Sequence, residues 1–269
     1  MKLISITLTT MLIAASAAAC SSGSDPSPDD GAAAATPQAA QSSNAAVSIP
    51  DAGEFTTRID NPYWPMRPGT RWTYRETDEG SVQRVEVVVT HRTKRIANGV
   101  TARVVRDTVT ENGEIVEDTE DWYAQDSDGN IWYLGENTAE FEDGKLTTRE
   151  GSFEAGVDGA EAGIMIPASP KPGMSYRQEL YEGHAEDRGE VLSTEELVEA
   201  PYGFFRNALL TKDTNDLEPR VQEYKLYAKG VGPVLVVAVS GSSGREELLR
   251  MESVESPSVG TGPLGHPKG

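Results

Sequence analysis

Cysteine and histidine are nearly missing from this sequence of 269 residues, which has one cysteine and three histidines. One cysteine excludes an internal disulfide framework, because each disulfide needs two. No second histidine stands at metal-ligand spacing from a first, which argues against a zinc site. Stability must therefore come from strand pairing and a packed core.

Positive charge is also scarce. Lysine and arginine number 24 against 43 acidic residues, which gives a formal net charge of -19 and a pI near 4.5. An acidic surface repels phosphates, so nucleic acid and anionic lipid are poor partners. The same composition favours solubility and is compatible with cations.

Long apolar runs are absent after the N-terminus. The apolar stretch 3–19 follows Lys2 and ends at Cys20, which is typical of a secretory signal. It is shorter than the roughly 20 residues that a membrane-spanning helix needs, and threonines dilute it. We therefore expect residues 1–19 to be a signal peptide. No nucleotide-binding or serine-hydrolase motif follows it, so catalysis has no support from a motif.

The four residues Ala17-Ala18-Ala19-Cys20 resemble the lipobox of bacterial lipoproteins. The resemblance implies cleavage before Cys20 and acyl chains on that cysteine, hence an extracytoplasmic protein anchored to a membrane. Ser21 rather than Asp follows, which implies the outer membrane if the host has one. Several acyl chains are needed for a stable anchor, since each buried methylene contributes about 0.8 kcal/mol. The alternative, an ordinary secreted protein, leaves the solitary cysteine unexplained.

Composition divides the rest of the chain into three parts. Residues 20–52 are mostly small or polar and predict a lipidated flexible tether, because they cannot bury enough apolar surface to fold. Residues 53–255 predict one domain. The Gly- and Pro-rich residues 256–269 predict a disordered tail.

Hairpin signals dominate the domain. Asn98-Gly99, Asn112-Gly113, Asp128-Gly129 and Asp143-Gly144 each separate strand-like runs and suit two-residue turns. They predict a long antiparallel meander, which continues after a loop over 156–173. Ten or eleven strands are expected, and a sheet of that size usually curls. The predicted fold is therefore all-β, with an antiparallel meander curled into a half-barrel or open barrel. A two-sheet sandwich is the alternative.

Counting from these turns gives a register. It places His91 opposite Arg106 and Asp121 opposite Glu136, all on the inner face. The four residues predict an interior polar cluster. Because like charges directly opposite each other repel, the cluster is either an internal salt-bridge network or a place for a cation or polar ligand group.

The same register gives the interior an aromatic lining. Tyr123 and Trp132 fall on the inner face beside the polar cluster. A mixed polar and aromatic interior suits a small or amphipathic ligand.

One acidic loop resembles part of a calcium site. Asp126 and Asp128 alternate before Gly129, as calcium ligands do. Ala124 and Gly135 occupy the positions of the first and last ligands. The plain alternative is a hairpin turn, so calcium is the only cofactor considered and none is required.

Three segments resemble a family of bacterial secreted or lipoprotein β-domains with no established activity: Asn61–Tyr74, Asp121–Glu136 and Tyr227–Val234. The resemblance implies an antiparallel β-domain at the cell surface and supplies no catalytic residues. The expected function is a membrane-anchored, non-enzymatic binding module for a small or amphipathic ligand. A structural surface protein without a ligand and a hydrolase are the alternatives, and the oligomeric state is left open.

Overall fold

The structure is a computed structural model that describes residues 49–266. Cys20, the signal peptide and most of the tether lie outside the described residues. One 3-10 turn, η1 (Ala52–Glu54), precedes the strands. The strands are β1 (Thr70–Asp78), β2 (Ser81–Arg95), β3 (Thr101–Glu111), β4 (Glu114–Gln125), β5 (Ile131–Glu142), β6 (Lys145–Thr148), β7 (Phe153–Glu154), β8 (Glu161–Ile166), β9 (Ser175–Arg177), β10 (Glu179–Leu180), β11 (Asp187–Ala200), β12 (Gly203–Asn215), β13 (Gln222–Ala228), β14 (Gly232–Ser240) and β15 (Arg245–Ser253). Among these residues no helix has the length and apolar character to cross a membrane.

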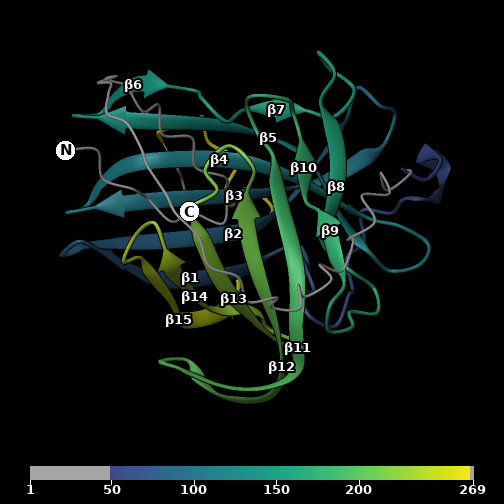
Figure 1. The fold of residues 1–269 in the computed structure, drawn as a ribbon. Helices are drawn as coiled ribbons and strands as arrows, with labels where there is room; N and C mark the ends of the chain where they lie inside the picture. Colours follow the sequence, from purple (N-terminus) through teal and green to yellow (C-terminus); the bar gives the residue numbers. More distant parts are fainter. Residues whose placement is uncertain (1–48, 267–269) are drawn as a thin grey trace, which may run out of the picture. The chain divides into compact units, whose positions relative to one another are not determined.

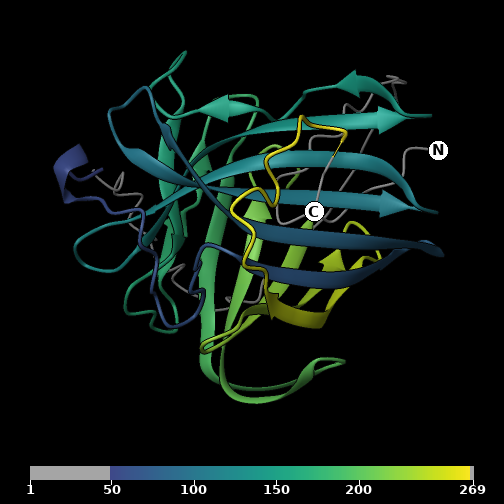
Figure 2. The same ribbon diagram turned by 180° about the vertical axis from the view of Figure 1, so that it is seen from behind.

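The strands form one antiparallel sheet in the order β10-β8-β5-β4-β3-β2-β1-β15-β14-β13-β12-β11-β9. Its two halves face each other. In Figure 1, β11 and β12 cross in front of the long strands β2–β5, and in Figure 2 the long strands are in front. The predicted curled barrel is therefore confirmed in preference to the sandwich.

A single short segment brings the two edges of the sheet together. β9 pairs with β11 and β10 pairs with β8, with only Gln178 between them. The chain over 175–180 thus bridges both edges. Closure of this kind leaves little unpaired strand edge, which protects a large sheet from edge-to-edge association. Gly163 of β8 is required here, because a Cβ would lie 2.4 Å from the carbonyl oxygen of Arg177.

The predicted turns are partly confirmed. Asn112-Gly113 and Asp143-Gly144 have two consecutive positive φ angles, as a type I′ turn requires. Glu79-Gly80 makes a third such turn that the sequence analysis missed. At Asn98-Gly99 and Asp128-Gly129 only the glycine has a positive φ, so these connections are looser.

Two expected irregular regions are ordered. The predicted loop over 156–173 contains β8, whose apolar residues pair with β5. The predicted disordered tail is wrong for residues 256–266. In Figure 2 this yellow segment runs across the outer face of the long strands, and Val259 within it is buried.

Aromatic side chains fill one end of the barrel. Trp64, from the segment before β1, lies with its ring centroid 5.5 Å from that of Tyr123 and 6.1 Å from that of Tyr227. Gly232 makes room for it, since a Cβ there would lie 2.7 Å from the indole. All three of the sequence segments that carry the family resemblance thus meet at this point.

A smaller apolar cluster lies on the outer face. It includes Trp122 and Leu134, and Phe55 packs against it from the N-terminal segment. Both faces of this part of the sheet therefore bury apolar residues, which explains why neither face reads as cleanly polar in the sequence.

Candidate functional site: an acidic barrel interior and an outer groove

Two predicted residues meet in the barrel interior. Asp121 of β4 lies opposite Glu136 of β5, as the register predicted. Both side chains are buried, with relative exposures of 4% and 2%. The hydroxyl oxygen of Tyr133 lies 2.9 Å from Asp121 Oδ1 and 3.0 Å from Glu136 Oε2. The phenol therefore bridges the two carboxyl groups.

The two contacts of the Tyr133 phenol bear on how many protons Asp121 and Glu136 carry. A phenol carries one hydrogen and can donate to only one carboxylate at a time. The second contact is a hydrogen bond only if that carboxyl is itself protonated and donates to the phenol oxygen. Burial raises the pKa of Tyr133 well above its ordinary value, so the phenol keeps its proton. When both contacts are hydrogen bonds at once, Asp121 and Glu136 share at least one proton.

The electrostatics agree with this count. Burial raises the pKa of Asp121 to about 7, although the hydrogen bond from Tyr133 lowers it. Burial, and then the neighbouring Asp121 and Glu179, raise the pKa of Glu136 well above its ordinary value. The pair therefore exchanges a proton near neutral pH.

Further carboxyl groups face the same interior from other strands. Glu246 of β15 lies directly opposite Glu76 of β1, and both are 1% exposed. Asp107 of β3 is 2% exposed. Burial, and then Asp121 and Glu246, raise the pKa of Asp107 well above its ordinary value. The carboxyl groups of β1, β3, β4, β5 and β15 thus form one electrostatically coupled set.

One buried ammonium group balances part of this charge. The Nζ of Lys225 lies 3.0 Å from Asp213 Oδ2 and 3.7 Å from Glu223 Oε2. Burial alone would lower the pKa of Lys225, but these two carboxylates outweigh it and the net shift is upward. This interior therefore stabilises an ammonium group.

Arg106 and His91 do not join this cluster, so their predicted interior placement is wrong. Register shifts between Val89 and Thr93 and between Val109 and Thr110 turn both residues away. Arg106 points to the outer face, where its Nε lies 2.8 Å from Asp118 Oδ1. His91 is exposed.

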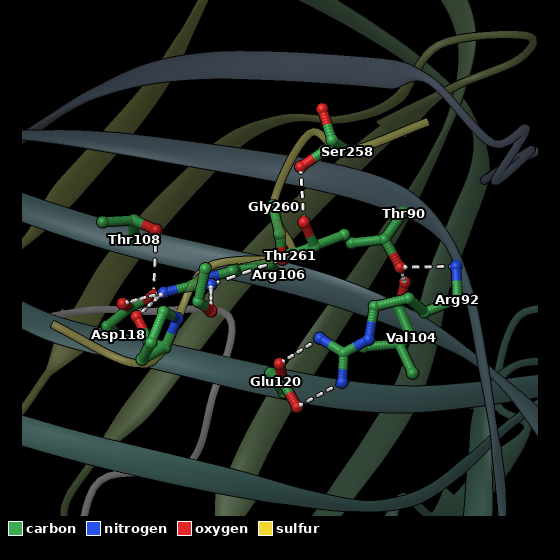
Figure 3. Close-up of polar contacts among 12 residues, drawn as sticks. Thr90, Arg92, Val104, Arg106, Thr108, Asp118, Glu120, Ser258, Gly260 and Thr261 are labelled. Carbon is green, nitrogen blue, oxygen red and sulfur yellow. Dashed lines mark hydrogen bonds and ion pairs between the residues drawn. The ribbon is translucent and has the colours of Figure 1, made fainter. Parts of the chain in front are cut away.

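The outward Arg106 explains the ordered tail. Its guanidinium pairs with Asp118 and donates to the carbonyl oxygens of Gly260, Gly262 and Pro263. Figure 3 shows this arginine between the carboxylate and the C-terminal segment. Its donors are therefore used within the chain, which suits a structural latch better than a ligand site.

Tyr123 and Trp132, the two aromatic residues predicted to line the interior, lie in different places. Tyr123 is buried among the interior aromatics, with its ring 5.0 Å from that of Tyr133. Trp132 is also buried, but its indole N–H donates to Asp126 and its ring meets Phe55 edge-on. Trp132 therefore anchors the N-terminal segment rather than lining the interior.

The loop considered for calcium uses its main carboxylate internally. Asp126 accepts hydrogen bonds from the backbone N–H groups of Asp128 and Asn130, from the Asn130 amide and from the Trp132 indole. These four donors describe a side-chain-stabilised turn. Within residues 49–266, no group of three or more His, Cys, Asp or Glu side chains is arranged to hold a metal ion.

A groove of about 500 Å³ crosses the outer face of β2–β5 and reaches β7. Its lining includes Arg92, Thr93, Lys94, Val104, Glu120, Trp122, Asn137, Ser152, Phe153 and Glu154. Two ion pairs frame it. Arg92 donates to Glu120 through the two terminal nitrogens of its guanidinium, as Figure 3 shows, and Lys94 Nζ lies 3.0 Å from Glu154 Oε2.

Trp122 forms an apolar surface between these pairs. Lys94 Nζ lies 4.3 Å from the centroid of its ring. The buried indole N–H of Trp122 has no hydrogen-bond acceptor among the described residues. The aromatic ring and the charged rim together suit a ligand with one apolar face and polar substituents.

The sequence analysis missed most of these residues. It did not single out Asp107, Tyr133, Glu76 or Glu246. Alternation gives each face only while the register is unbroken, and the bulges described above interrupt it. The direct Glu76–Glu246 opposition depends on strands that are 170 residues apart in the sequence, which no local pattern reveals.

No protein-family model matches the sequence, and no curated protein matches it. Three solved structures are similar to it. One is a protein from Bacteroides fragilis described as exported, with a YmcC-like fold (15% identity, 71% of this chain and 99% of that chain, TM-score 0.43). Another, from Parabacteroides distasonis, is described as a lipoprotein (12%, 71% and 98%, TM-score 0.36). The third is a β-barrel-like domain of unknown function from Brucella abortus (12%, 69% and 98%, TM-score 0.37). At TM-scores below 0.5 these likenesses carry no argument about function.

Proposed function

We propose that this chain is an exported, lipid-anchored binding module, and that the outer groove takes a small or amphipathic ligand. The groove itself carries the proposal. It offers about 500 Å³, within the usual range for small-molecule sites, and it combines the Trp122 surface with two ion pairs. The lipobox at Cys20 supports the anchor, because it accounts for the only cysteine in the chain.

The ligand's chemistry follows from the lining. Val104 and Trp122 offer apolar surface, so one face of the ligand is apolar. Arg92 and Lys94 are each paired with a carboxylate, so the rim has no net charge to neutralise. A neutral or zwitterionic ligand therefore fits better than a polyanion.

The test is native mass spectrometry of the mature protein purified from its host. We expect a retained small molecule in the wild type and its loss in Trp122→Leu. Phe204→Leu is the matched control, since Phe204 is an aromatic residue 53% exposed on another strand. Lys94→Met tests the rim without removing the ring, and thermal melting verifies that each variant is folded.

The structural alternative makes the opposite prediction. A surface protein without a ligand would carry no retained mass, and Trp122→Leu would change only stability. That result would contradict the proposal.

A further inference from the structure

We infer that the acidic end of the barrel interior, around Glu246 and Asp107, is a separate binding site for a small organic cation with an ammonium head. The site is on the opposite face of the sheet from the groove. The inference therefore does not depend on the proposed function.

The first observation is an unpartnered buried carboxylate. Both carboxylate oxygens of Glu246 are buried and have no hydrogen-bond partner among the described residues, and the side chain is 1% exposed. Asp107 Oδ1 is in the same state. Leaving a buried acceptor unpaired costs about 1–3 kcal/mol, and more for a charged group. A hydrogen-bond donor close to these oxygens would remove this cost.

The second observation is that the donor required is cationic. Glu246 lies opposite Glu76, and like charges directly across two strands repel. Burial raises the pKa of the Tyr74 phenol well above its ordinary value, and the charges of Glu246 and Asp107 raise it further. Both carboxyl groups therefore act on the same phenol. While both carboxylates are ionised, a neutral donor would satisfy the hydrogen bonds but would leave the repulsion.

The third observation is that the chain already places an ammonium group nearby. Lys225 stays charged in this interior because Asp213 and Glu223 hold it. Its charge also acts on Glu246, where it opposes the effects of burial and Glu76. Lys225 is committed to its own two carboxylates, so it does not satisfy the oxygens of Glu246.

An ammonium group fits these requirements better than a metal ion. An ammonium group offers three N–H donors for the two unpartnered oxygens of Glu246. The buried ring of Tyr74 suits a cation. In the described part of the chain no set of three side chains is arranged as metal ligands. The ligand class is therefore a small primary amine rather than a divalent cation.

Calorimetric titration of the purified full-length mature chain at pH 7 tests the inference. The probes are ethylammonium and putrescine, with ethanol as the neutral counterpart, tetramethylammonium as a cation without N–H donors, and potassium chloride. We expect binding of the primary amines alone. Glu246→Gln should weaken it at least tenfold, and Glu255→Gln, an exposed acid after the same strand, should not change it.

The other outcomes overturn the inference. If no amine binds and Glu246→Gln only raises the melting temperature, the carboxyl groups hold protons alone. If Glu246→Gln and Glu255→Gln weaken binding equally, the amines bind the acidic surface. Should Glu246→Gln fail to fold, Asp107→Asn provides the same comparison. Trp122→Leu should leave amine binding intact, which separates this site from the groove.

Discussion

The two ends of the barrel interior differ in the side chains that they bury. At one end Trp64, Tyr123 and Tyr227 pack ring against ring, and burial there stabilises the fold. The acidic end is the coupled set of carboxyl groups that includes Glu76, Glu246, Asp107, Asp121 and Glu136, and these are buried with one another at a cost to stability. A protein keeps a costly arrangement where a function depends on it. The difference assigns stability to the aromatic end, and the proposed amine site lies at the acidic end.

Truncating the aromatic end should have the largest effect. Trp64→Ala removes a side chain that is 2% exposed and leaves a cavity beside Tyr123 and Tyr227. We expect a loss of about 3–5 kcal/mol in the free energy of unfolding. Urea denaturation measures it. The control is Phe204→Ala at an exposed site, where the change should stay within about 0.5 kcal/mol.

A carboxylate with a cationic partner should behave unlike one without. Asp118 is fully buried and pairs with Arg106, so Asp118→Ala strands a buried guanidinium. We expect a loss of about 3 kcal/mol in stability and faster proteolysis of the C-terminal segment. Arg106→Met combined with Asp118→Ala should recover part of the loss. Equal losses in the single and double variants would show that the pair is not the cause.

The acidic end should gain stability when its charge is removed. The folded-state pKa of Asp121, about 7, lies above its ordinary value of 3.8. The folded state therefore favours the protonated form, and this contribution is complete below about pH 4 and is lost as the pH rises through 7. We expect wild-type stability to fall between about pH 4 and pH 7, by on the order of a few kcal/mol. In thermal melts, Asp121→Asn should flatten this dependence. An unchanged slope would contradict the assignment.

Exposed ion pairs should matter least. Arg75 on the outer face of β1 is 47% exposed and pairs with Glu247 at 2.7 Å. Because solvent screens such a pair, Arg75→Ala should cost about 0.2–1 kcal/mol, and less in high salt. A double-mutant cycle with Glu247→Ala isolates the pair. A coupling above this range would mean that outer charges contribute to stability as the core does.

The sequence predicted the architecture better than the site. Turn residues such as Asn112-Gly113 act locally, so the hairpins and the curled sheet could be anticipated. The Asp121–Glu136 opposition could be anticipated too, because one hairpin joins the two strands. Arg106 could not be placed, since a single bulge reverses every later side chain.

The prediction of disorder for the C-terminal segment was wrong for a related reason. Its Gly and Pro content predicts disorder, but its backbone carbonyls satisfy Arg106 from about 155 residues away in the chain. The composition of a segment indicates how much apolar surface the segment can bury by itself. It does not reveal a hydrogen-bond partner, such as Arg106, elsewhere in the chain. The Glu246 site is likewise made by strand pairing between the two ends of the domain.

Carbon-detected NMR titration of the side-chain carboxyl groups of Asp121 and Glu136 is the most direct test of the acidic end. The bridge through Tyr133 predicts that the pair retains one shared proton at pH 6, with loss of that proton only near neutral pH or above. Tyr133→Phe should change the two titrations together. If both carboxyl groups are fully ionised by pH 5, the acidic end is an ordinary solvated cluster, and the contrast between the two ends of the barrel would not hold.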